Sequence, residues 1–323
     1  MDLGALIANE GFPPTTLVLA YGSGAVPQAG YASAKEQPML DLVLVVEDAV
    51  EWHRANLAVN RSHYSVLALG GPNLIAQAQR TTAGVYYNTL VPMKSAQESG
   101  GSRLMKYGVV SRVDLEDDLN SWRWLYLSGR LHKPVLLSPF KSDSLQNSLR
   151  ANLSSAVRAA LLLLPAEFTR EDVYLAIAGL SYGGDLRMLF GENPDKVSNI
   201  VRPNLARFDD LYNPILKDFA ELCDWNLGSE ASTGRCSQDT SRATRRLLAE
   251  SLPSAVRFPI TSDASPEGAL RARLRSVVRT SSAIQSGKGI LTAGPVKSAA
   301  YSGAKIGKWA AWQAAKWSKR LRP

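Results

Sequence analysis

The sequence Tyr21-Gly22-Ser23-Gly24, followed by Asp41-Leu-Val-Leu-Val-Val46, carries the strongest indication of fold and function in this chain. Residues 15–21 are apolar and β-branched, so they predict a strand that leads into the Gly-Ser turn, and residues 40–46 predict a buried strand. Glycines let a backbone approach phosphate closely, and their N–H groups with a Ser hydroxyl can cradle phosphate oxygens. A carboxylate on the next strand can hold Mg²⁺ against the same phosphates. The pattern alone leaves open an ordinary tight turn between two strands.

The composition is that of a globular chain large enough for two domains. The chain has 323 residues, of which 45% are hydrophobic and 20% are charged. Two cysteines in a polar stretch and three scattered histidines predict neither a disulfide framework nor a zinc site. No run of about eighteen apolar residues is present, so no membrane-spanning helix is expected.

The positive charge is concentrated in the C-terminal part of the chain. The formal net charge is +8, but residues 267–323 contain twelve Lys or Arg and one acid, which leaves about −3 for the rest. A basic tail of this kind suits an anionic partner, either nucleic acid or an acidic membrane.

The order of predicted elements indicates an α+β fold. Strands are expected at residues 84–91 and 104–111, and helices at 48–57 and 113–128. Strands and helices do not alternate as in βαβ units. Several short helices, one of them capped by Thr169, then predict a mainly helical region. We therefore divide the chain into residues 1–140, a helical region at 141–252 with a polar loop at 223–251, and a C-terminal region at 253–323.

Lys106 and Asp41 are the first candidate site residues. A Lys within a buried strand is costly unless it meets an anion, so Lys106 is expected to contact phosphate; an edge strand with the Lys in solvent is the equally weighted alternative. The turn and Asp41 resemble nucleotidyltransferase sites of the polymerase β type, which normally place a second acid two residues along, on the same strand face. That position is Val43. Glu47 shares the face, but it would lie about 20 Å away at ~3.3 Å per residue.

Asp185 is the best substitute for the missing acid. It follows Tyr182-Gly-Gly184, whose glycines let the backbone pass close to a ligand, and Arg187 stands two residues on. The alternative is that Asp185 caps the next element and pairs with Arg187 on the surface.

Two segments near the C-terminus carry further candidates. Residues 279–289 contain Arg279 and Lys288 and could fold over a phosphate, although their composition alone predicts an exposed linker. In residues 296–323 most basic side chains fall on one arc of a helical wheel, with Trp309, Trp312 and Trp317 near its borders. This pattern is typical of a helix in the lipid headgroup layer. A helix packed on the body, or a disordered basic tail, is the alternative.

Together these segments resemble one family, the mitochondrial phosphatidate cytidylyltransferases, or CDP-diacylglycerol synthases. The resemblance covers most of residues 10–220 and about 253–296, with many separate motifs in order. The matching motifs are Tyr21-Gly-Ser-Gly, Gln28-Ala-Gly-Tyr, Met39-Leu-Asp-Leu-Val, Glu51-Trp-His, His63-Tyr-Ser, Ala83-Gly-Val-Tyr-Tyr-Asn-Thr-Leu, Lys106-Tyr-Gly-Val-Val-Ser, Leu127-Ser-Gly-Arg-Leu-His-Lys-Pro-Val, Ala178-Gly-Leu-Ser-Tyr-Gly-Gly-Asp-Leu-Arg-Met, Val201-Arg-Pro-Asn and Ser282-Ala-Ile-Gln-Ser-Gly-Lys-Gly-Ile-Leu-Thr-Ala-Gly.

The resemblance implies a nucleotidyltransferase domain of the polymerase β type, a winged-helix-like second domain, and a C-terminal region that returns to the active site and ends in an amphipathic basic helix. The implied reaction is CTP plus phosphatidic acid to CDP-diacylglycerol plus pyrophosphate, with Mg²⁺. The implied location is peripheral, at the matrix face of the mitochondrial inner membrane, feeding cardiolipin synthesis.

The resemblance also implies roles for the candidate residues. Gly22, Ser23 and Gly24 would cradle the triphosphate, Lys106 would neutralise its charge, and Asp41 would hold Mg²⁺ with Asp185 as partner. Asp41, Lys106 and Asp185 form the expected catalytic set. The phosphatidate headgroup is assigned to Arg187, Arg279 and Lys288, and membrane contact to Trp309, Trp312 and Trp317. Because the attacking phosphate is already ionised, catalysis would be mainly positioning and charge neutralisation.

Two other functions are compatible with the residues alone. One is a non-catalytic module that binds membrane or nucleic acid, although residues 145–218 lack the basic cluster of a DNA-recognition helix. The other is a nucleotidyltransferase that acts on a different acceptor. The sequence leaves self-association open.

Overall fold

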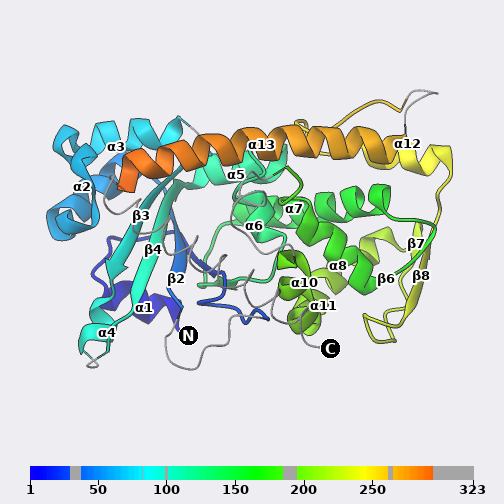
Figure 1. Cartoon of the computed structure of the whole chain (residues 1–323), viewed down its shortest axis with the longest axis horizontal. Coiled ribbons are helices and arrows are strands. Elements are labelled where there is room, and N and C mark those ends of the chain that lie inside the picture. The colour runs from blue at the N-terminus through cyan, green and yellow to red at the C-terminus, as the bar shows by residue number, and fades with distance from the viewer. Residues whose placement is uncertain (30–37, 82, 99–100, 185–194, 261–264, 294–323) are drawn as a thin grey trace, which may run out of the picture.

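The computed structural model describes residues 1–29, 38–81, 83–98, 101–184, 195–260 and 265–293, and the side chains of Ser286 and residues 288–293 lie outside the description. One half of the molecule is built on a five-stranded mixed sheet with the order β3-β4-β2-β1-β5 (Figure 1). The strands are β1 (Leu17–Tyr21), β2 (Leu40–Val46), β3 (Val85–Pro92), β4 (Leu104–Ser111) and β5 (Leu136–Leu137). β2 and β4 are parallel, and the other pairs are antiparallel. The expected α+β class is confirmed at this level.

Helices cover both faces of this sheet because its strands are apolar on both sides. Leu40, Leu42 and Leu44 pack towards α1 (Leu3–Asn9) and α2 (Ala49–Val59), and α3 (Gly71–Arg80) follows on the same side. Strand alternation places Asp41 and Val43 on the opposite face. That face is covered by α5 (Arg112–Ser121), α6 (Ser128–Leu131) and the start of α7 (Asp143–Leu163).

Local capping explains where several helices begin. The Asp48 carboxylate accepts hydrogen bonds from the N–H groups of Val50 and Glu51, and Thr169 forms a reciprocal capping box with Asp172 at α8 (Arg170–Gly179). The expected cap at Thr169 is therefore confirmed, and Asp48 caps α2 in the same way.

The expected single helix at 113–128 is wrong. α5 ends at Ser121, because Trp122 adopts a left-handed conformation with φ of +55°. The buried Asp118 carboxylate accepts hydrogen bonds from the backbone N–H groups of Trp124, Leu127 and Ser128 at 2.9–3.0 Å. This carboxylate fixes the turn and the beginning of α6.

The second half of the molecule is mainly helical. Around α7 and α8 it contains α10 (Lys196–Val201), η3 (Arg202–Asn204), α11 (Leu205–Leu216), η4 (Lys217–Phe219) and α12 (Arg242–Glu250), with a small sheet of β6 (Glu167–Thr169), β8 (Arg235–Gln238) and β7 (Cys223–Asp224). Its core includes the fully buried Tyr174, Phe208 and Tyr212, whose rings lie within 6.3 Å of one another.

The expected polar loop at 223–251 is also wrong. This segment forms β7, β8 and α12, and Cys223 and Cys236 are buried free thiols. The Gln238 side chain donates hydrogen bonds to the carbonyls of Leu161, Leu164 and Pro165, which tie the segment to the end of α7. Tertiary hydrogen bonds of this kind hold a polar segment that has little hydrophobic pattern of its own.

The longest helix, α13 (Pro266–Ala293), runs along both halves of the molecule (Figure 1). Leu270, Leu274 and Val278 are buried, and α13 contacts both α7 and β3. Residues 279–289 are therefore helical, which corrects the expected linker. None of the helices within the described ranges is long and apolar enough to cross a membrane.

Candidate active site

The Gly-Ser-Gly turn lies directly against the first residues of β2. Tyr21 pairs with Asp41 in the antiparallel register, and Gly22 has φ of +74°, which favours glycine. A Cβ added at Gly22 would lie 3.1 Å from Asp41 Oδ2, and one added at Gly24 would lie 2.3 Å from the Met39 carbonyl oxygen. Glycine at position 22 therefore lets the turn lie against the Asp41 carboxylate, and glycine at position 24 lets it lie against the backbone of Met39.

Arg103 holds the far side of this turn, and sequence reasoning missed it. Its guanidinium donates hydrogen bonds to the carbonyls of Gly24 at 2.8 Å and Pro38 at 3.1 Å. The backbone N–H groups of Ala25 and Val26 bond to the Gly22 carbonyl at 3.1 and 2.9 Å. The turn is thus fixed from both ends.

Lys106 lies beside Asp41 on an interior strand. β4 pairs with both β3 and β2, so the edge-strand alternative for Lys106 is wrong. Lys106 is the parallel register partner of Asp41, and strand alternation puts both half-buried side chains on one face. Lys106 Nζ is 4.3 Å from the centroid of the Tyr87 ring.

Arg130 of α6 brings a second cation to the same face. Its guanidinium lies 4.6 Å from the Tyr21 ring centroid and 4.8 Å from that of Tyr126, and it donates a 3.1 Å hydrogen bond to the Tyr126 hydroxyl. Within the described part of the chain, Arg130 Nε is buried without a hydrogen-bond partner. A buried donor of this kind is satisfied by an anionic ligand or by water.

The same acid and cation act on the pKa of the Tyr21 hydroxyl. Burial raises the pKa of the Tyr21 hydroxyl, the Arg130 cation opposes that rise, and the Asp41 carboxylate adds to it. The Tyr21 ring therefore lies within electrostatic reach of both the acid and the cation.

Lys133 and Lys196 extend the positive region into the helical half. Lys133 Nζ donates hydrogen bonds to the Gly129 carbonyl and, at 2.9 Å, to Ser181 Oγ. The pKa of Lys133 is lowered to about 7, mainly because the amine is buried and also because the Arg130 and Lys196 cations are close to it. A bound anion would raise this pKa again, because it favours the charged form of the amine.

The helical half is docked onto the segment that follows the turn. Lys196 donates to Gln28 Oε1 at 3.3 Å, and Asn204 donates to the Pro27 carbonyl at 2.8 Å. The Ala29 N–H also bonds to the Asn199 carbonyl at 3.1 Å. α6 and α10 thus lie in the middle of the molecule, where the two halves meet (Figure 1).

The structure brings together Gly22, Ser23, Gly24, Asp41 and Lys106. Arg279 is exposed on α13, and Lys288 belongs to the same helix but its side chain is outside the description. Asp185, Arg187, Trp309, Trp312 and Trp317 also lie outside the described residues.

The turn before Asp185 nevertheless has a defined place. Gly184 has φ of +94°, and a Cβ there would lie 2.8 Å from the Arg275 carbonyl oxygen of α13. Ser181 in the same turn receives the Lys133 hydrogen bond. The chain that leads to Asp185 is therefore tied to the positive region.

Besides Arg103, sequence reasoning missed Arg130, Lys133 and Lys196. Arg130 and Lys133 both stand in the matched motif Leu127–Val135, as cations among apolar neighbours. That local signal could have selected them, since charged side chains in such surroundings usually have a partner.

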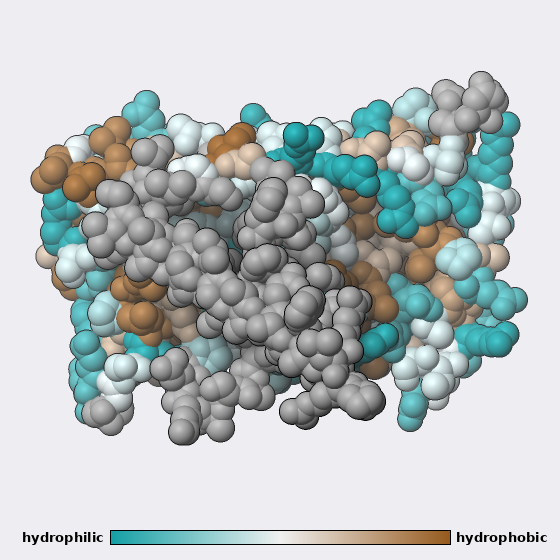
Figure 2. Space-filling model, in the orientation of Figure 1, coloured by the Kyte–Doolittle hydropathy of each residue, from teal (hydrophilic) through white to brown (hydrophobic). Residues whose placement is uncertain are grey.

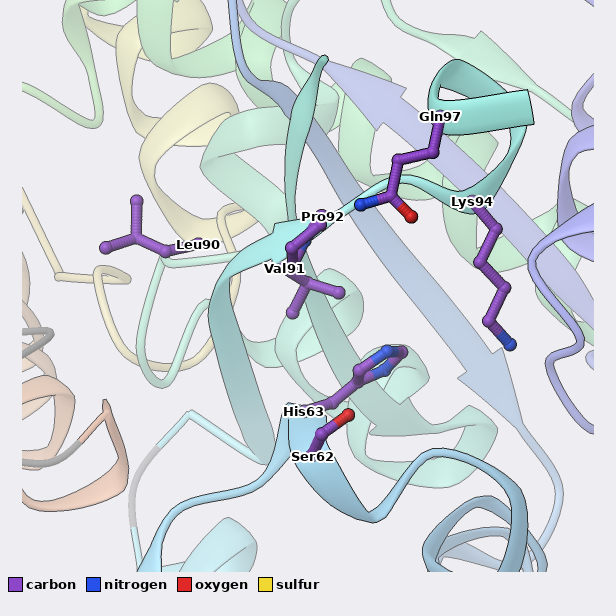
Figure 3. A pocket seen from close by; sticks show the side chains of 7 residues that line it. All are labelled: Ser62, His63, Leu90, Val91, Pro92, Lys94 and Gln97. Atoms are coloured by element: carbon purple, nitrogen blue, oxygen red, sulfur yellow. The ribbon is translucent and has the colours of Figure 1, made fainter. Parts of the chain in front are cut away.

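A cavity of about 300 Å³ lies on the other face of the sheet, beside the bulge in β3 (Figure 3). It is lined by Ser62, His63, Leu90, Val91, Pro92, Lys94 and Gln97. His63 bonds to the Tyr107 hydroxyl at 3.0 Å, and Lys94 Nζ donates to the Glu10 carbonyl and to Asn60, both at 3.0 Å. None of the candidate site residues that the structure describes is among the lining residues.

The donor set at Asp41 fits a divalent cation that is shared with a substrate. Among the described residues no group of three or more His, Cys, Asp or Glu side chains could hold a metal by itself. A hard cation such as Mg²⁺ needs only one or two carboxylates when substrate phosphates and waters complete its shell. Asp41 is half-buried beside a phosphate-type turn, so one protein carboxylate is present where such a shell requires it.

A glycine-rich turn, a strand carboxylate and several cations on one sheet face are compatible with a nucleotidyltransferase. Comparison with known families agrees: the family model described as "Phosphatidate cytidylyltransferase, mitochondrial" matches residues 7–268 and 259–308. The chain belongs to this family.

Similar proteins support the assignment over most of the chain. The chain is 42% identical over 316 residues to the mitochondrial phosphatidate cytidylyltransferase of Xenopus laevis, covering 91% of this chain and 90% of the relative. It is 40% identical over 322 residues to that of Danio rerio, covering 92% of each. The Dictyostelium discoideum protein is 42% identical over 226 residues, covering 64% of this chain and 51% of the relative.

Proposed function

We propose that this chain transfers the cytidylyl group of CTP to phosphatidic acid, forming CDP-diacylglycerol and releasing pyrophosphate in mitochondria. The observation that carries the proposal is the contact between the Gly22 turn and Asp41, with Lys106 in register on the next interior strand. The similarity to mitochondrial phosphatidate cytidylyltransferases over about nine-tenths of the chain supports the choice of both substrates.

The triphosphate of CTP binds at the turn. Gly22, Ser23 and Gly24 supply backbone N–H groups and a hydroxyl, and Lys106 supplies a point charge at the same end of the sheet. Arg130 and Lys133, both half-buried, add positive charge from the α6 side, where partial burial strengthens their interaction with an anion. Charge on the leaving pyrophosphate is neutralised by the same groups.

Asp41 holds Mg²⁺ in this proposal, with Asp185 as the partner acid. Bound Mg²⁺ supplies charge neutralisation and orients the phosphates. The Asp41 carboxylate is positioned for this by β2 on one side and by the glycine turn on the other, so it needs little rearrangement on substrate binding.

The chemical step needs no strong base from the protein. A phosphatidate oxygen, already ionised at neutral pH, attacks the α-phosphorus of CTP in line, the new P–O bond forms, and the bond to pyrophosphate breaks. The protein therefore contributes orientation and positive charge. Arg187, Arg279 and Lys288 are assigned to the phosphatidate headgroup.

The architecture proposed for this reaction has three parts. Residues 1–140 form a nucleotidyltransferase domain of the polymerase β type, residues 141–252 a winged-helix-like domain, and residues 253–323 a C-terminal region. In the last part, Trp309, Trp312 and Trp317 on a basic amphipathic helix bind an anionic membrane surface. The protein then acts peripherally at the matrix face of the inner membrane and feeds cardiolipin synthesis.

Product analysis tests the proposal. The full chain is incubated with CTP labelled in its α-phosphate, Mg²⁺ and vesicles that contain phosphatidic acid, and the lipid extract is separated. The expected result is labelled CDP-diacylglycerol that is absent when phosphatidic acid or Mg²⁺ is left out. A label that appears on protein, RNA or a water-soluble acceptor and never on lipid would contradict the proposed acceptor.

A further inference from the structure

The short helix η2 (Val66–Gly70) presents an unusually exposed apolar surface. Val66 is 74% exposed and Leu69 is 82% exposed, which are the two largest values among the exposed large apolar side chains in the described ranges. A 3₁₀-helix has three residues per turn, so residues three apart project from one side. Leu74, at the start of α3, is 40% exposed nearby. We call Val66, Leu69 and Leu74 the apolar tip, and Figure 2 shows hydrophobic surface at this end of the molecule.

The apolar tip is held in place by the fold. Between its two most exposed residues, Ala68 is buried with Tyr64, Ile75 and Tyr86, and Leu67 packs against the same cluster. The Ala68 N–H bonds to the Ser65 carbonyl at 3.1 Å. The inward residues therefore anchor η2 while Val66 and Leu69 face outward, so their exposure belongs to the folded state.

The segment that carries the apolar tip has a small excess of positive charge. Residues 48–81, which include α2 with its N-cap, η2 and α3, contain three arginines and two acids, Asp48 and Glu51, and Glu51 pairs with Arg54. Arg54, Arg61 and Arg80 are all exposed. Exposed apolar side chains beside arginines are complementary to a surface with anionic headgroups and an apolar interior.

The course of α13 also favours a membrane contact at the apolar tip. α3 and α13 both contact β3, and Figure 1 shows α13 running towards the end where α2 and α3 lie. α13 also exposes Arg271, Arg273, Arg275 and Arg279. It ends at Ala293, after which residues 294–323 contribute seven Lys or Arg and no acid. α13 thus begins on the helical half and ends on the same half as the apolar tip, and the basic residues of the C-terminal segment follow that end in the sequence.

We propose that the apolar tip inserts among the headgroups of an anionic membrane. It forms a contact separate from the C-terminal segment, so the protein holds the bilayer through two elements. The inference rests on the proposed function only in that the acceptor is a lipid. A second copy of this chain is a poorer partner, because two positively charged tips would repel each other.

Vesicle flotation of the full chain tests this proposal. The double variant Val66→Ser/Leu69→Ser is compared with Val113→Ser/Leu247→Ser, which removes apolar side chains of 65% and 56% exposure elsewhere. On vesicles of phosphatidylcholine with phosphatidylglycerol, the tip variant should bind at least about tenfold more weakly, equivalent to about 1.4 kcal/mol. The control variant should bind as the wild type does. Equal binding by both variants would overturn the proposal.

A dye attached at the tip gives a second measurement that does not depend on affinity. Leu69→Cys, labelled with an environment-sensitive fluorophore, should shift its emission to shorter wavelength on these vesicles, and labelled Val113→Cys should not. The native Cys223 and Cys236 are buried. An unshifted tip spectrum, or a tip variant that changes only the oligomeric state in size-exclusion chromatography, would overturn the proposal.

Activity on detergent-dispersed phosphatidic acid separates this inference from the proposed function. The Val66→Ser/Leu69→Ser variant should retain wild-type activity on that substrate, since neither side chain lies at the candidate active site. A wild-type protein that binds vesicles through the tip but forms no CDP-diacylglycerol would contradict the proposed function and leave the membrane contact standing.

Discussion

Replacing Gly22 by Ala should damage the site through two effects that can be calculated from the structure. Gly22 has φ of +74°, and an L-residue in that conformation costs roughly 1–2 kcal/mol. The added Cβ would lie 3.1 Å from Asp41 Oδ2, so the carboxylate must shift by a few tenths of an ångström. A misplacement of about 1 Å lowers a rate about 100-fold. Because the shift here is only a few tenths of an ångström, we expect kcat/KM for CTP to fall about tenfold.

Gly11→Ala is the matched control. Gly11 has φ of +70°, and its nearest neighbour is the flexible end of Lys94 at 3.3 Å; it precedes Phe12, which packs on the face of the sheet opposite Asp41. Denaturant unfolding should show a similar stability loss in both variants. Cytidylyl transfer should fall only in Gly22→Ala. If both variants lose stability equally and both keep wild-type activity, the idea that the turn positions the carboxylate is refuted.

Three further predictions concern charge. Arg130→Met removes the guanidinium beside Tyr21, so KM for CTP should rise about tenfold, and an unchanged KM would count against a role in triphosphate binding. The pKa of Lys133 is about 7, so its amine loses the proton as the pH rises above that value. The kcat/KM for CTP of the wild type should then fall more steeply with pH than that of Lys133→Arg, because arginine stays charged. Parallel pH profiles would argue against a role of Lys133 in binding CTP. A chain ending at Gly294 lacks seven basic residues, each of which contributes about 1 kcal/mol near an anionic surface. The fraction of protein that floats with anionic vesicles should therefore drop sharply. Unchanged flotation would exclude this segment as a membrane anchor.

Elements with strong local patterns were predictable from the sequence. The apolar run at 40–46 forms β2, and the predicted strand at 104–111 forms β4 over the same residues. Asp48 and Thr169 begin helices because a side-chain oxygen satisfies free N–H groups, which is a local interaction. The pairing of the Gly-Ser-Gly turn with Asp41 was likewise predictable, because the two segments are successive strands of one sheet.

Elements that depend on tertiary contacts were not predictable in this way. Residues 279–289 are rich in Ser and Gly, which favours a loop, yet they continue α13 and bury Ser281 and Ser282. Arg130 reaches the site because the buried Asp118, twelve residues earlier, fixes the turn before α6. Lys196 arrives from the other half of the molecule. No local pattern shows that these two cations meet at one site.

Asp41→Asn is the most direct test of the central claim, that the carboxylate beside the glycine turn holds the metal for cytidylyl transfer. The substitution keeps the shape of the side chain and removes its charge. Release of pyrophosphate from CTP with phosphatidic acid and Mg²⁺ should fall about 1000-fold or more, with the thermal unfolding midpoint near that of the wild type. Wild-type turnover by a folded Asp41→Asn protein would contradict the claim.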